Sequence, residues 1–327
     1  MTASVNVVPT RTLADFYQGV PFGTAVGTVG WSPLPLEAMA GRDERWNIGF
    51  QQELFTLTTL EVNYVGTMGS HQQQAENINL PPAGPGSVQT RRPYPRFGNL
   101  SVHTQAMSSR YHALQTKLQK RLSDGFWYLA SYTFSSSVRT VPAPEIGGNY
   151  TYEESPAPSD TPHLFAFSSG YALPFARSNA LLGGWQVQTI VTFRSGLPFT
   201  PTISRDVANN GVGGQRPNRV ASGTVANPTI DMWFDKTAFV VPDQYTFGNS
   251  GASILRADHQ WNVDASLFKR FAIPSSKTIE LRAEAFNLLN SVYFAAPNTV
   301  IDTAAGGRVT STSNQARQIQ LGGKFTF

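Results

Sequence analysis

The sequence contains no cysteine, and no stretch of its 327 residues approaches the length of an apolar membrane-spanning helix. Without cysteine, neither a disulfide framework nor a thiolate metal site can form. A spanning helix needs about 18 or more apolar residues in succession, so a helical membrane protein is excluded as well. Charged residues are scarce at 14%, whereas a soluble domain carries about a quarter. This shortage argues against an ordinary soluble enzyme.

Clustered positive charge is lacking too. The net charge is only +4, and the densest basic cluster, in residues 91–96, is short and interrupted by prolines. Nucleic-acid-binding surfaces carry longer stripes or patches of lysine and arginine. The sequence therefore indicates no nucleic-acid partner.

Strand-forming residues are abundant. Aromatic residues make up 12%, and the 28 glycines and 22 prolines favour strands and turns over helices. Nine segments alternate apolar and polar residues with a period of two, the pattern of a strand with one apolar face. They are residues 46–54, 60–64, 112–118, 126–134, 165–173, 185–193, 261–271, 279–285 and 319–327; Lys269 interrupts the apolar face of its segment. The sequence predicts an all-β, antiparallel sheet of about nine or ten strands, each near the ~9–11 residues that span a membrane.

Large apolar residues stand eight positions apart on several of these strands, as in Trp185 and Phe193. Eight steps cover roughly 26 Å, close to the ~25 Å between the two aromatic girdles of a membrane barrel. In a soluble β-sandwich, large residues would concentrate at mid-strand, where this chain often has Ala, Thr or Ser. The spacing predicts lipid-interface aromatics at Trp46, Phe126, Phe134, Phe165, Trp185, Phe193 and Trp261.

Long and short connections alternate along the chain. Tight turns are expected at 55–57, 123–125 and 273–277, a moderate connection at 174–183, and long ones at 66–110, 137–162, 195–259 and 290–315. An up-and-down transmembrane β-barrel has long extracellular loops on one rim and short periplasmic turns on the other. With the long loops outside, the C-terminus is expected in the periplasm.

The beginning of the chain does not fit a complete exported barrel. Residues 1–45 are rich in glycine and proline and are interpreted as an outer-loop remnant, and they lack the features of a signal peptide. Closed bacterial barrels have even strand numbers, whereas the predicted count is odd. We therefore expect that an N-terminal part is missing and that residues 46–327 form the C-terminal part of a larger barrel.

Short sequence stretches support this interpretation. They are Tyr64–His71, Tyr111–Arg121, Tyr132–Ser135, Asp160–His163, Tyr171–Phe175, Gly184–Trp185, Ser195–Thr200, Trp233–Phe239, Asp264–Phe271 and Arg282–Asn290. In this order they resemble the C-terminal barrel half of TonB-dependent receptors, in the Oar-like branch with a carboxypeptidase-regulatory-like domain.

The resemblance implies a barrel of about 22 strands with an N-terminal plug in its lumen. It also implies uptake of a bound substrate energised through the TonB complex, with no cofactor. This sequence contains no regulatory-like domain, plug or TonB box. Its expected partners are therefore outer-membrane lipid, the missing plug and barrel half, the TonB complex acting through that plug, and the outer-membrane insertion machinery.

Two groups of residues are candidates for function. The charged residues of one predicted hairpin share its polar face and, because charge toward lipid is costly, are expected to line the lumen. They are Asp264, Arg270, Glu280, Arg282 and Glu284. A solvated lattice of ion pairs is the simpler interpretation, and contact with plug or substrate is the alternative.

The last strand ends in Phe325 and Phe327 and resembles the assembly signal of outer-membrane barrels, since an edge strand can pair with another sheet. The alternative is an ordinary lipid-facing strand.

Catalytic motifs are lacking. The five histidines show no metal-ligand spacing, and there is no Gly-x-Ser-x-Gly nucleophile motif. Asp160–His163 is expected to shape a loop-to-strand turn, and the glycine-rich segment Asn209–Gln215 to be a flexible outer loop. The sequence predicts a non-enzymatic part of a receptor or transporter barrel in the outer membrane of a Gram-negative cell. A self-contained smaller barrel, porin-like or enzymatic, and a soluble extracellular β-sandwich adhesin are the alternatives.

Overall fold

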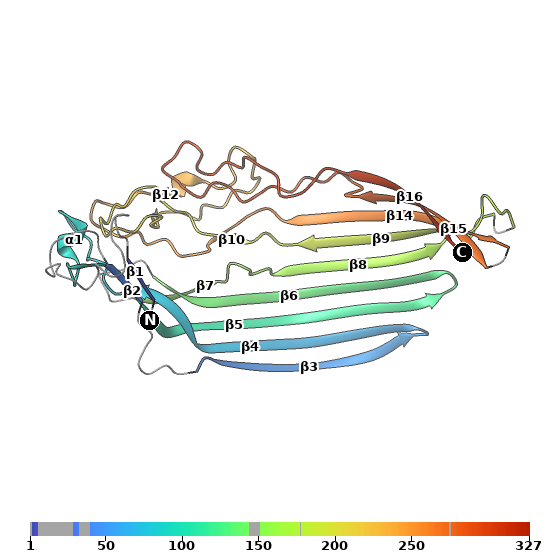
Figure 1. Ribbon diagram of the computed structural model, residues 1–327, viewed down its shortest axis with the longest axis horizontal. Coiled ribbons are helices and arrows are strands. Elements are labelled where there is room, and N and C mark those ends of the chain that lie inside the picture. The colour runs from blue at the N-terminus through green and yellow to red at the C-terminus, as the bar shows by residue number, and fades with distance from the viewer. Residues whose placement is uncertain (1, 6–28, 33–39, 144–150, 177, 275) are drawn as a thin grey trace, which may run out of the picture.

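The computed structural model describes residues 2–5, 29–32, 40–143, 151–176, 178–274 and 276–327. Nine long strands form one sheet in which each pairs antiparallel with the long strand before it (Figure 1). They are β3 (Arg42–Phe55), β4 (Thr58–Asn77), β5 (Phe97–Ser123), β6 (Phe126–Pro142), β8 (His163–Ala172), β9 (Trp185–Arg194), β14 (Gln260–Ile273), β15 (Lys277–Phe286) and β16 (Gln318–Thr326). The predicted antiparallel, nearly helix-free sheet is confirmed.

Three short strands complete this sheet at its loop end. They are β1 (Thr2–Val5), β2 (Val29–Ser32) and β7 (Tyr152–Pro156). β2 pairs with β5 in the parallel sense, the one parallel pairing in the described sheet. Of the proposed loop remnant, residues 1–45, the structure thus describes two short strands and the start of β3; the remainder lies outside the described residues.

Two strands are much longer than the sequence indicated. β4 has 20 residues and β5 has 27, against the expected ~9–11. The excess is the pairing of residues 72–77 with 101–107, a polar extension interrupted by register shifts between Gly69 and Gln74. His71 in this interval has a positive φ of 53°, as expected for a bulged strand. Since both faces of this extension are polar, period-two alternation gave no sign of it.

The connections sort by length between the two ends of the strands (Figure 1). Tight turns occupy residues 56–57, 124–125 and 274–276, and a moderate connection occupies 173–184. All lie at one end, called here the turn end, together with the C-terminus. Long connections at 78–96, 143–162, 195–259 and 287–317 lie at the other, the loop end. Asp124 and Gly125 both have positive φ, which a two-residue hairpin turn of the primed type requires. The alternation predicted from the sequence is confirmed.

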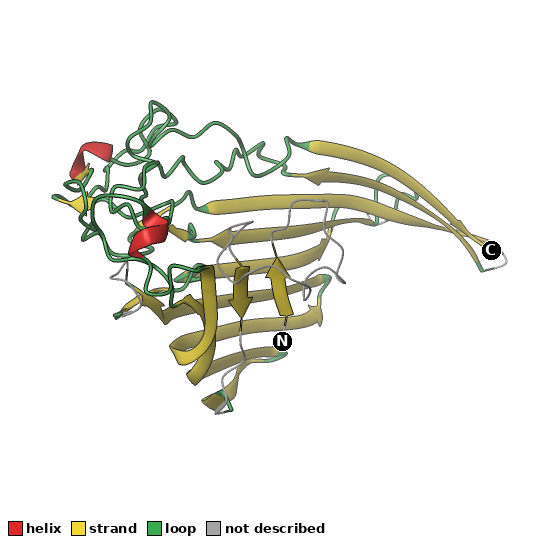
Figure 2. Ribbon diagram, turned by 60° about the vertical axis from the view of Figure 1, so that its left-hand side comes forward, coloured by secondary structure: helices red, strands yellow, loops and turns green. Residues whose placement is uncertain are grey.

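The sheet is open and strongly curved (Figure 2), and the compact hydrophobic core lies in the long loops. Ile203, Phe234, Ala238, Phe239, Leu255 and Ile301 form this core. Two two-stranded sheets accompany it, β10 (Pro198–Phe199) with β13 (Leu255–Arg256) and β11 (Asn218–Arg219) with β12 (Phe239–Val240). The helical elements among the described residues are α1 (Val88–Arg91) and the 3-10 turn η2 (Lys236–Ala238). Within the described residues, no helix has the length and apolar character to cross a membrane.

Candidate functional site

The two faces of the long sheet differ in chemistry. One, called here the apolar face, presents alternate residues such as Ile48, Leu114 and Leu281 in cross-strand register. These three side chains are 73%, 45% and 43% exposed, so protein does not cover them. Large apolar patches of this kind mark surfaces that meet lipid or another protein.

An aromatic row crosses the apolar face near the loop end. Tyr132, Phe165, Phe193 and Trp261 lie directly opposite one another on four adjacent strands. Cross-strand aromatic pairs of this kind stabilise a sheet. Of the aromatics selected from the sequence, Phe134 lies two residues from this row on β6, and Trp46 lies at the same end of β3.

The position of the Trp46 indole ring requires a glycine on the neighbouring strand. Trp46 stands opposite Gly66 of β4, and a Cβ at Gly66 would lie 2.2 Å from the indole ring. The ring therefore packs over backbone that only glycine leaves bare. The same arrangement recurs on the opposite face, where a Cβ at Gly170 would lie 2.2 Å from the indole nitrogen of Trp127.

Three of the five histidines lie near the loop end of the apolar face, a feature that sequence reasoning missed. Tyr64 hydrogen-bonds His112, and Tyr132 hydrogen-bonds His163, each through Nδ1 at 2.8 Å. The third, His259, packs against Phe193 with ring centroids 5.8 Å apart. The signal was present in the sequence, because His112 and His163 share the parity of the apolar residues on their strands. In the described part of the chain, no group of three or more His, Asp or Glu is placed to hold a metal ion.

A second aromatic group marks the turn end of the apolar face. Phe126 packs edge-on against Tyr171, with centroids 5.8 Å apart, and Trp185 lies opposite Lys269. Two lysines accompany these rings. Lys120 Nζ lies 5.7 Å from the Phe126 centroid, and Lys269 Nζ lies 4.6 Å from the Phe271 centroid.

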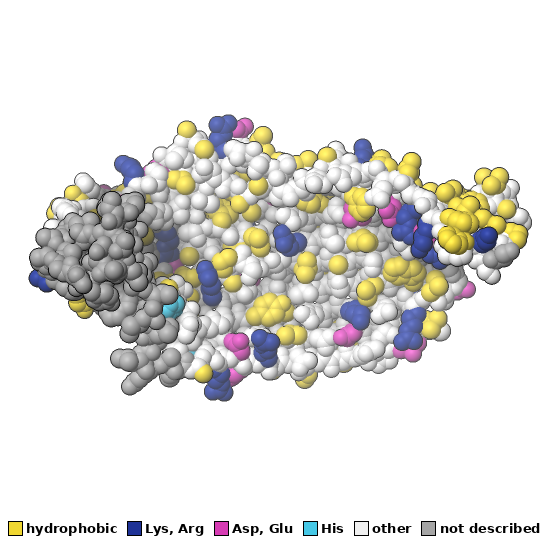
Figure 3. All heavy atoms as spheres, in the orientation of Figure 1, with side chains coloured by type: hydrophobic (Ala, Val, Ile, Leu, Met, Phe, Trp, Pro, Cys, Tyr) yellow, Lys and Arg dark blue, Asp and Glu magenta, His cyan; other side chains and the backbone are white. Residues whose placement is uncertain are grey.

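The opposite, polar face carries a chain of ion pairs. Arg270 Nε lies 2.6 Å from Glu280, and Arg282 lies 2.9 Å from Glu280 and 3.2 Å from Glu284. The Arg282 guanidinium also covers the ring of Phe268 at 5.2 Å. The structure thus brings together four of the five charged residues selected from the sequence. Figure 3 shows acidic and basic side chains in adjacent positions along the strands on the face turned to the viewer.

Asp264 departs from the expected lattice. Its carboxylate accepts hydrogen bonds from Asn262 Nδ2 and from the backbone N–H of Asn287, each at 2.8 Å, so it joins β14 to the loop that follows β15. Nearby, the hydroxyl of Tyr293 donates to the carbonyl of Trp261. Burial, and secondly the charge of Asp264, raise the pKa of Tyr293.

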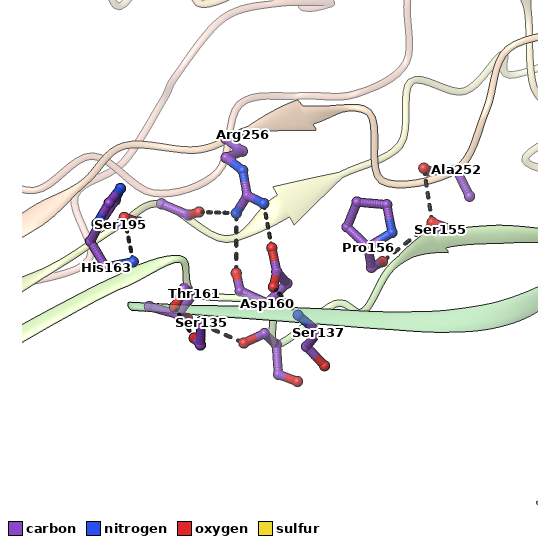
Figure 4. A network of polar contacts seen from close by, with 12 residues as sticks. Ser135, Ser137, Ser155, Pro156, Asp160, Thr161, His163, Ser195, Ala252 and Arg256 are labelled. Carbon is purple, nitrogen blue, oxygen red and sulfur yellow. Dashed lines mark hydrogen bonds and ion pairs between the residues drawn. The ribbon is translucent and has the colours of Figure 1, made fainter. Parts of the chain in front are cut away.

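The Asp160–His163 segment connects the sheet to the longest loop (Figure 4). Asp160 accepts a hydrogen bond from the Ser137 N–H at 2.6 Å and forms an ion pair with Arg256. Arg256 also donates to the carbonyls of Asp160 and Gly196, each at 3.1 Å. Asp160 and His163 have separate partners, because His163 binds Tyr132 through its ring and Ser195 through its backbone. The pair fastens the loop to the strands and is not arranged as a catalytic dyad.

The long loops enclose a cleft that the sequence did not reveal. It has a volume of about 770 Å³ and is lined by Gly86, residues 205–207, Asn209 and residues 241–245. Beside it, Asp302 accepts two hydrogen bonds from Ser204 at 2.8 Å and one from Arg205 at 3.4 Å. Burial alone would raise the pKa of Asp302, but these hydrogen bonds outweigh it and lower the pKa.

The glycine-rich segment Asn209–Gln215 is a packed part of this loop assembly. The Asp206 carboxylate accepts hydrogen bonds from the N–H groups of Asn210 and Gly211 and from the Gln215 side chain. Asn209 Nδ2 donates to the carbonyls of Gly84 and Gly86 at 2.8 and 2.9 Å. Polar side chains thus bond this segment to neighbouring residues, and its flexibility stays a prediction.

β16 forms one edge of the described sheet, and β3 forms the other. Every residue of both strands is exposed, and each strand has one partner among the described strands. Phe325 and Phe327 stack at 5.7 Å at the free end of β16. Both edges therefore present unpaired backbone groups along their length.

A comparison with protein families agrees with this architecture. The family model described as "Outer membrane beta barrel domain" matches residues 2–320. No curated protein matches the chain. Among solved structures it is similar to the pyoverdine outer membrane receptor FpvA from Pseudomonas aeruginosa PAO1 bound to pyoverdine, with a TM-score of 0.46 and 9% identity over 88% of this chain and 30% of that one. It is also similar to the outer membrane transporter YddB from Escherichia coli, with a TM-score of 0.46 and 10% identity over 87% of this chain and 32% of that one. The chain thus spans about a third of the length of these two structures.

Proposed function

This chain belongs to the outer membrane beta-barrel domain family, and we propose that it forms part of the barrel wall of an outer-membrane receptor for substrate uptake. One observation carries the proposal: an exposed apolar face with aromatic groups at both ends backs a polar face with a chain of ion pairs. In a membrane barrel the apolar face lies on lipid and the charged face on the lumen. The long loops would then meet the extracellular medium, and the turns and C-terminus the periplasm.

In finer detail, the receptor is a TonB-dependent one of the Oar-like branch. The support is the ordered series of stretches from Tyr64–His71 to Arg282–Asn290. In this proposal the two open edges pair with further barrel strands, because an unpaired backbone group in lipid costs several kcal/mol. The plug and the TonB contact come from outside this chain, so the chain does not transport substrate alone. The loop cleft would then face arriving substrate.

The observations favour this proposal over a soluble β-sandwich. A sandwich would cover the apolar face with a second sheet at about 10 Å. The other two sheets of the described chain have two strands each and consist of loop segments. The aliphatic side chains of the apolar face are exposed instead.

The orientation is tested by labelling single cysteines on intact cells, which is clean because this chain has no cysteine. Ser222→Cys lies in the longest loop and Asp124→Cys in a tight turn, and both positions are exposed. A membrane-impermeant maleimide should label the Ser222 site on intact cells, and the Asp124 site only after the outer membrane is opened. Equal labelling of both sites on intact cells would contradict the proposed topology.

The open edges are tested separately by producing residues 1–327 alone and within the complete receptor. We expect the complete receptor to migrate as a heat-modifiable monomer and the isolated chain to aggregate or be degraded. Efficient insertion of the isolated chain as a heat-modifiable monomer would favour the self-contained smaller barrel.

A further inference from the structure

The connection between β8 and β9, residues 173–184, carries exposed large apolar side chains at the turn end of the molecule. It lies at the turn end in Figure 1, where hydrophobic side chains gather in Figure 3. Its side chains include Phe175, Leu181 and Leu182, which are 54%, 72% and 60% exposed. The neighbouring turn at Asp124–Gly125 offers no apolar side chain. A connection in water gains nothing from exposing three large apolar groups.

A lysine fastens this connection to the apolar face. Lys269 has the same strand parity as Leu267 and Phe271, and it stands opposite Trp185. Its Nζ donates to the carbonyls of Ala180 and Leu181 at 2.7 and 3.0 Å. The side chain is only 3% exposed, because the connection covers it. Lys269, the residue that interrupts the apolar alternation of its segment, therefore holds the connection against the apolar face; these two hydrogen bonds are called here the clamp.

The segment that Lys269 holds is itself ordered. Asn179 Oδ1 accepts hydrogen bonds from the N–H groups of Leu181 and Leu182 at 2.8 and 2.9 Å, and the Asn179 carbonyl accepts one from the Gly183 N–H. The indole of Trp185 donates to the Leu181 carbonyl at 3.4 Å. With their backbone groups bonded inward, the two leucines point their side chains away from the protein.

We propose that this connection is an interfacial anchor, whose Leu181 and Leu182 side chains insert into the lipid leaflet at the turn end. The inference rests on the proposed function, because it takes the apolar face as the lipid-facing one. The occupant is a lipid surface, since the exposed leucines continue the apolar face beyond Trp185. Lys120 and Lys277 lie on the same face at the same end, where long cationic side chains reach phosphate headgroups while their stems stay in the apolar layer.

The test measures depth with nitroxide labels on single cysteines in the complete receptor, assembled in outer membranes. Leu181→Cys is compared with Val191→Cys, in the middle of the apolar face, and with Asp124→Cys, in a neighbouring turn. The readout is the accessibility of each label to oxygen, which concentrates in lipid, relative to a water-soluble nickel chelate. We expect the Leu181 label to have a ratio several-fold above that of the Asp124 label and on the side of the Val191 label.

The outcomes separate the two proposals. A water-like ratio at Leu181 with a lipid-like ratio at Val191 would overturn the anchor and leave the lipid-facing sheet intact. Water-like ratios at both would overturn the proposed function, and the anchor with it. A Leu181 label shielded from both reagents would mean that a protein partner covers the connection, and would also overturn the anchor.

A second variant tests the clamp. Lys269→Ala in the Leu181→Cys background removes the two hydrogen bonds that hold the connection, so the ratio should fall toward that of the Asp124 label. Lys324→Ala is the matched control, because Lys324 is an exposed lysine at the same end that lies opposite Glu280 on the polar face. An unchanged ratio with Lys269→Ala would show that the lysine does not position the anchor.

Discussion

Asn79 is a single side chain that organises an entire loop. It is fully buried, and its Nδ2 approaches the carbonyls of Tyr94, Phe97 and Gly98 at 3.1, 3.1 and 2.7 Å. Its Oδ1 accepts a hydrogen bond from the Tyr94 N–H at 2.7 Å. One amide thus joins the 78–96 connection to the first residues of β5, whose Phe97 and Gly98 carbonyls also accept from Gln89 and Arg92.

Asn79→Ala should therefore loosen this connection. Leaving the Tyr94 N–H without its partner costs about 1–3 kcal/mol, so we expect a loss of that size in local stability. The measurement is hydrogen exchange at the Tyr94 amide, which should become much faster. Thr90→Ala removes an exposed hydrogen bond in the same loop and should have little effect. Equal exchange in the two variants would contradict the role given to Asn79.

Asp302 should make the stability of the loops beside the cleft depend on pH. Its pKa is lowered in the folded loops because Ser204 and Arg205 stabilise the carboxylate. A carboxyl whose folded pKa is below the unfolded value contributes stability above the unfolded pKa, about 3.9, and loses it as the pH falls through the folded pKa. We expect proteolysis of the 287–317 loop to accelerate on acidification below about pH 4, using an acid-active protease. The increase should be absent in Asp302→Asn, which is already weakened at neutral pH. A parallel acid response in both proteins would assign it to other groups.

At the scale of a single element, β16 is the strand whose sequence most directly suggests a role in assembly. Phe327 is 93% exposed, so its loss removes little packing within this chain. Contact with lipid would be worth about 1–3 kcal/mol for such a side chain. If the insertion machinery recognises the terminal aromatic, Phe327→Ala in the complete receptor should sharply lower the folded amount in purified outer membranes. Val191→Ala, on the same face in mid-sheet, is the control, and equal losses would remove the assembly role.

Elements also show what a sequence can predict and why. All nine long strands follow from alternation, because lipid or protein on one face and polar surroundings on the other impose a period of two. Alternation did not predict the extension of β4 and β5, because residues 72–77 are polar on both faces. Lys269 was visible as a break, but its partners at Ala180 and Leu181 lie in a connection with no repeating pattern. The loop core and its cleft depend on contacts between distant segments, which no local pattern encodes.

At the scale of the whole molecule, two kinds of contact differ greatly in span along the chain. Strands pair with the strand before them, and three of those pairs are joined by turns of only two or three residues. The loop core instead joins remote segments, as where Thr202 bridges Val300 and where Ile203 packs with Ile301. Closing such long intervals costs more chain entropy, and non-local contacts form slowly.

This difference sets an order of events during folding. The hairpins can form one after another. The core around Phe234 can form only after β9, β14 and β15 have paired, because this pairing brings together the ends of the long loops that make up the core. In pulsed hydrogen exchange during refolding of the complete receptor, the amides of β4 and β5 should be protected before those of Trp233 and Ile301, which bond the distant carbonyls of Gly307 and Thr202. Simultaneous protection would contradict this order. The loop assembly with its cleft would then be the last part of the chain to mature, after the sheet beneath it is already in place.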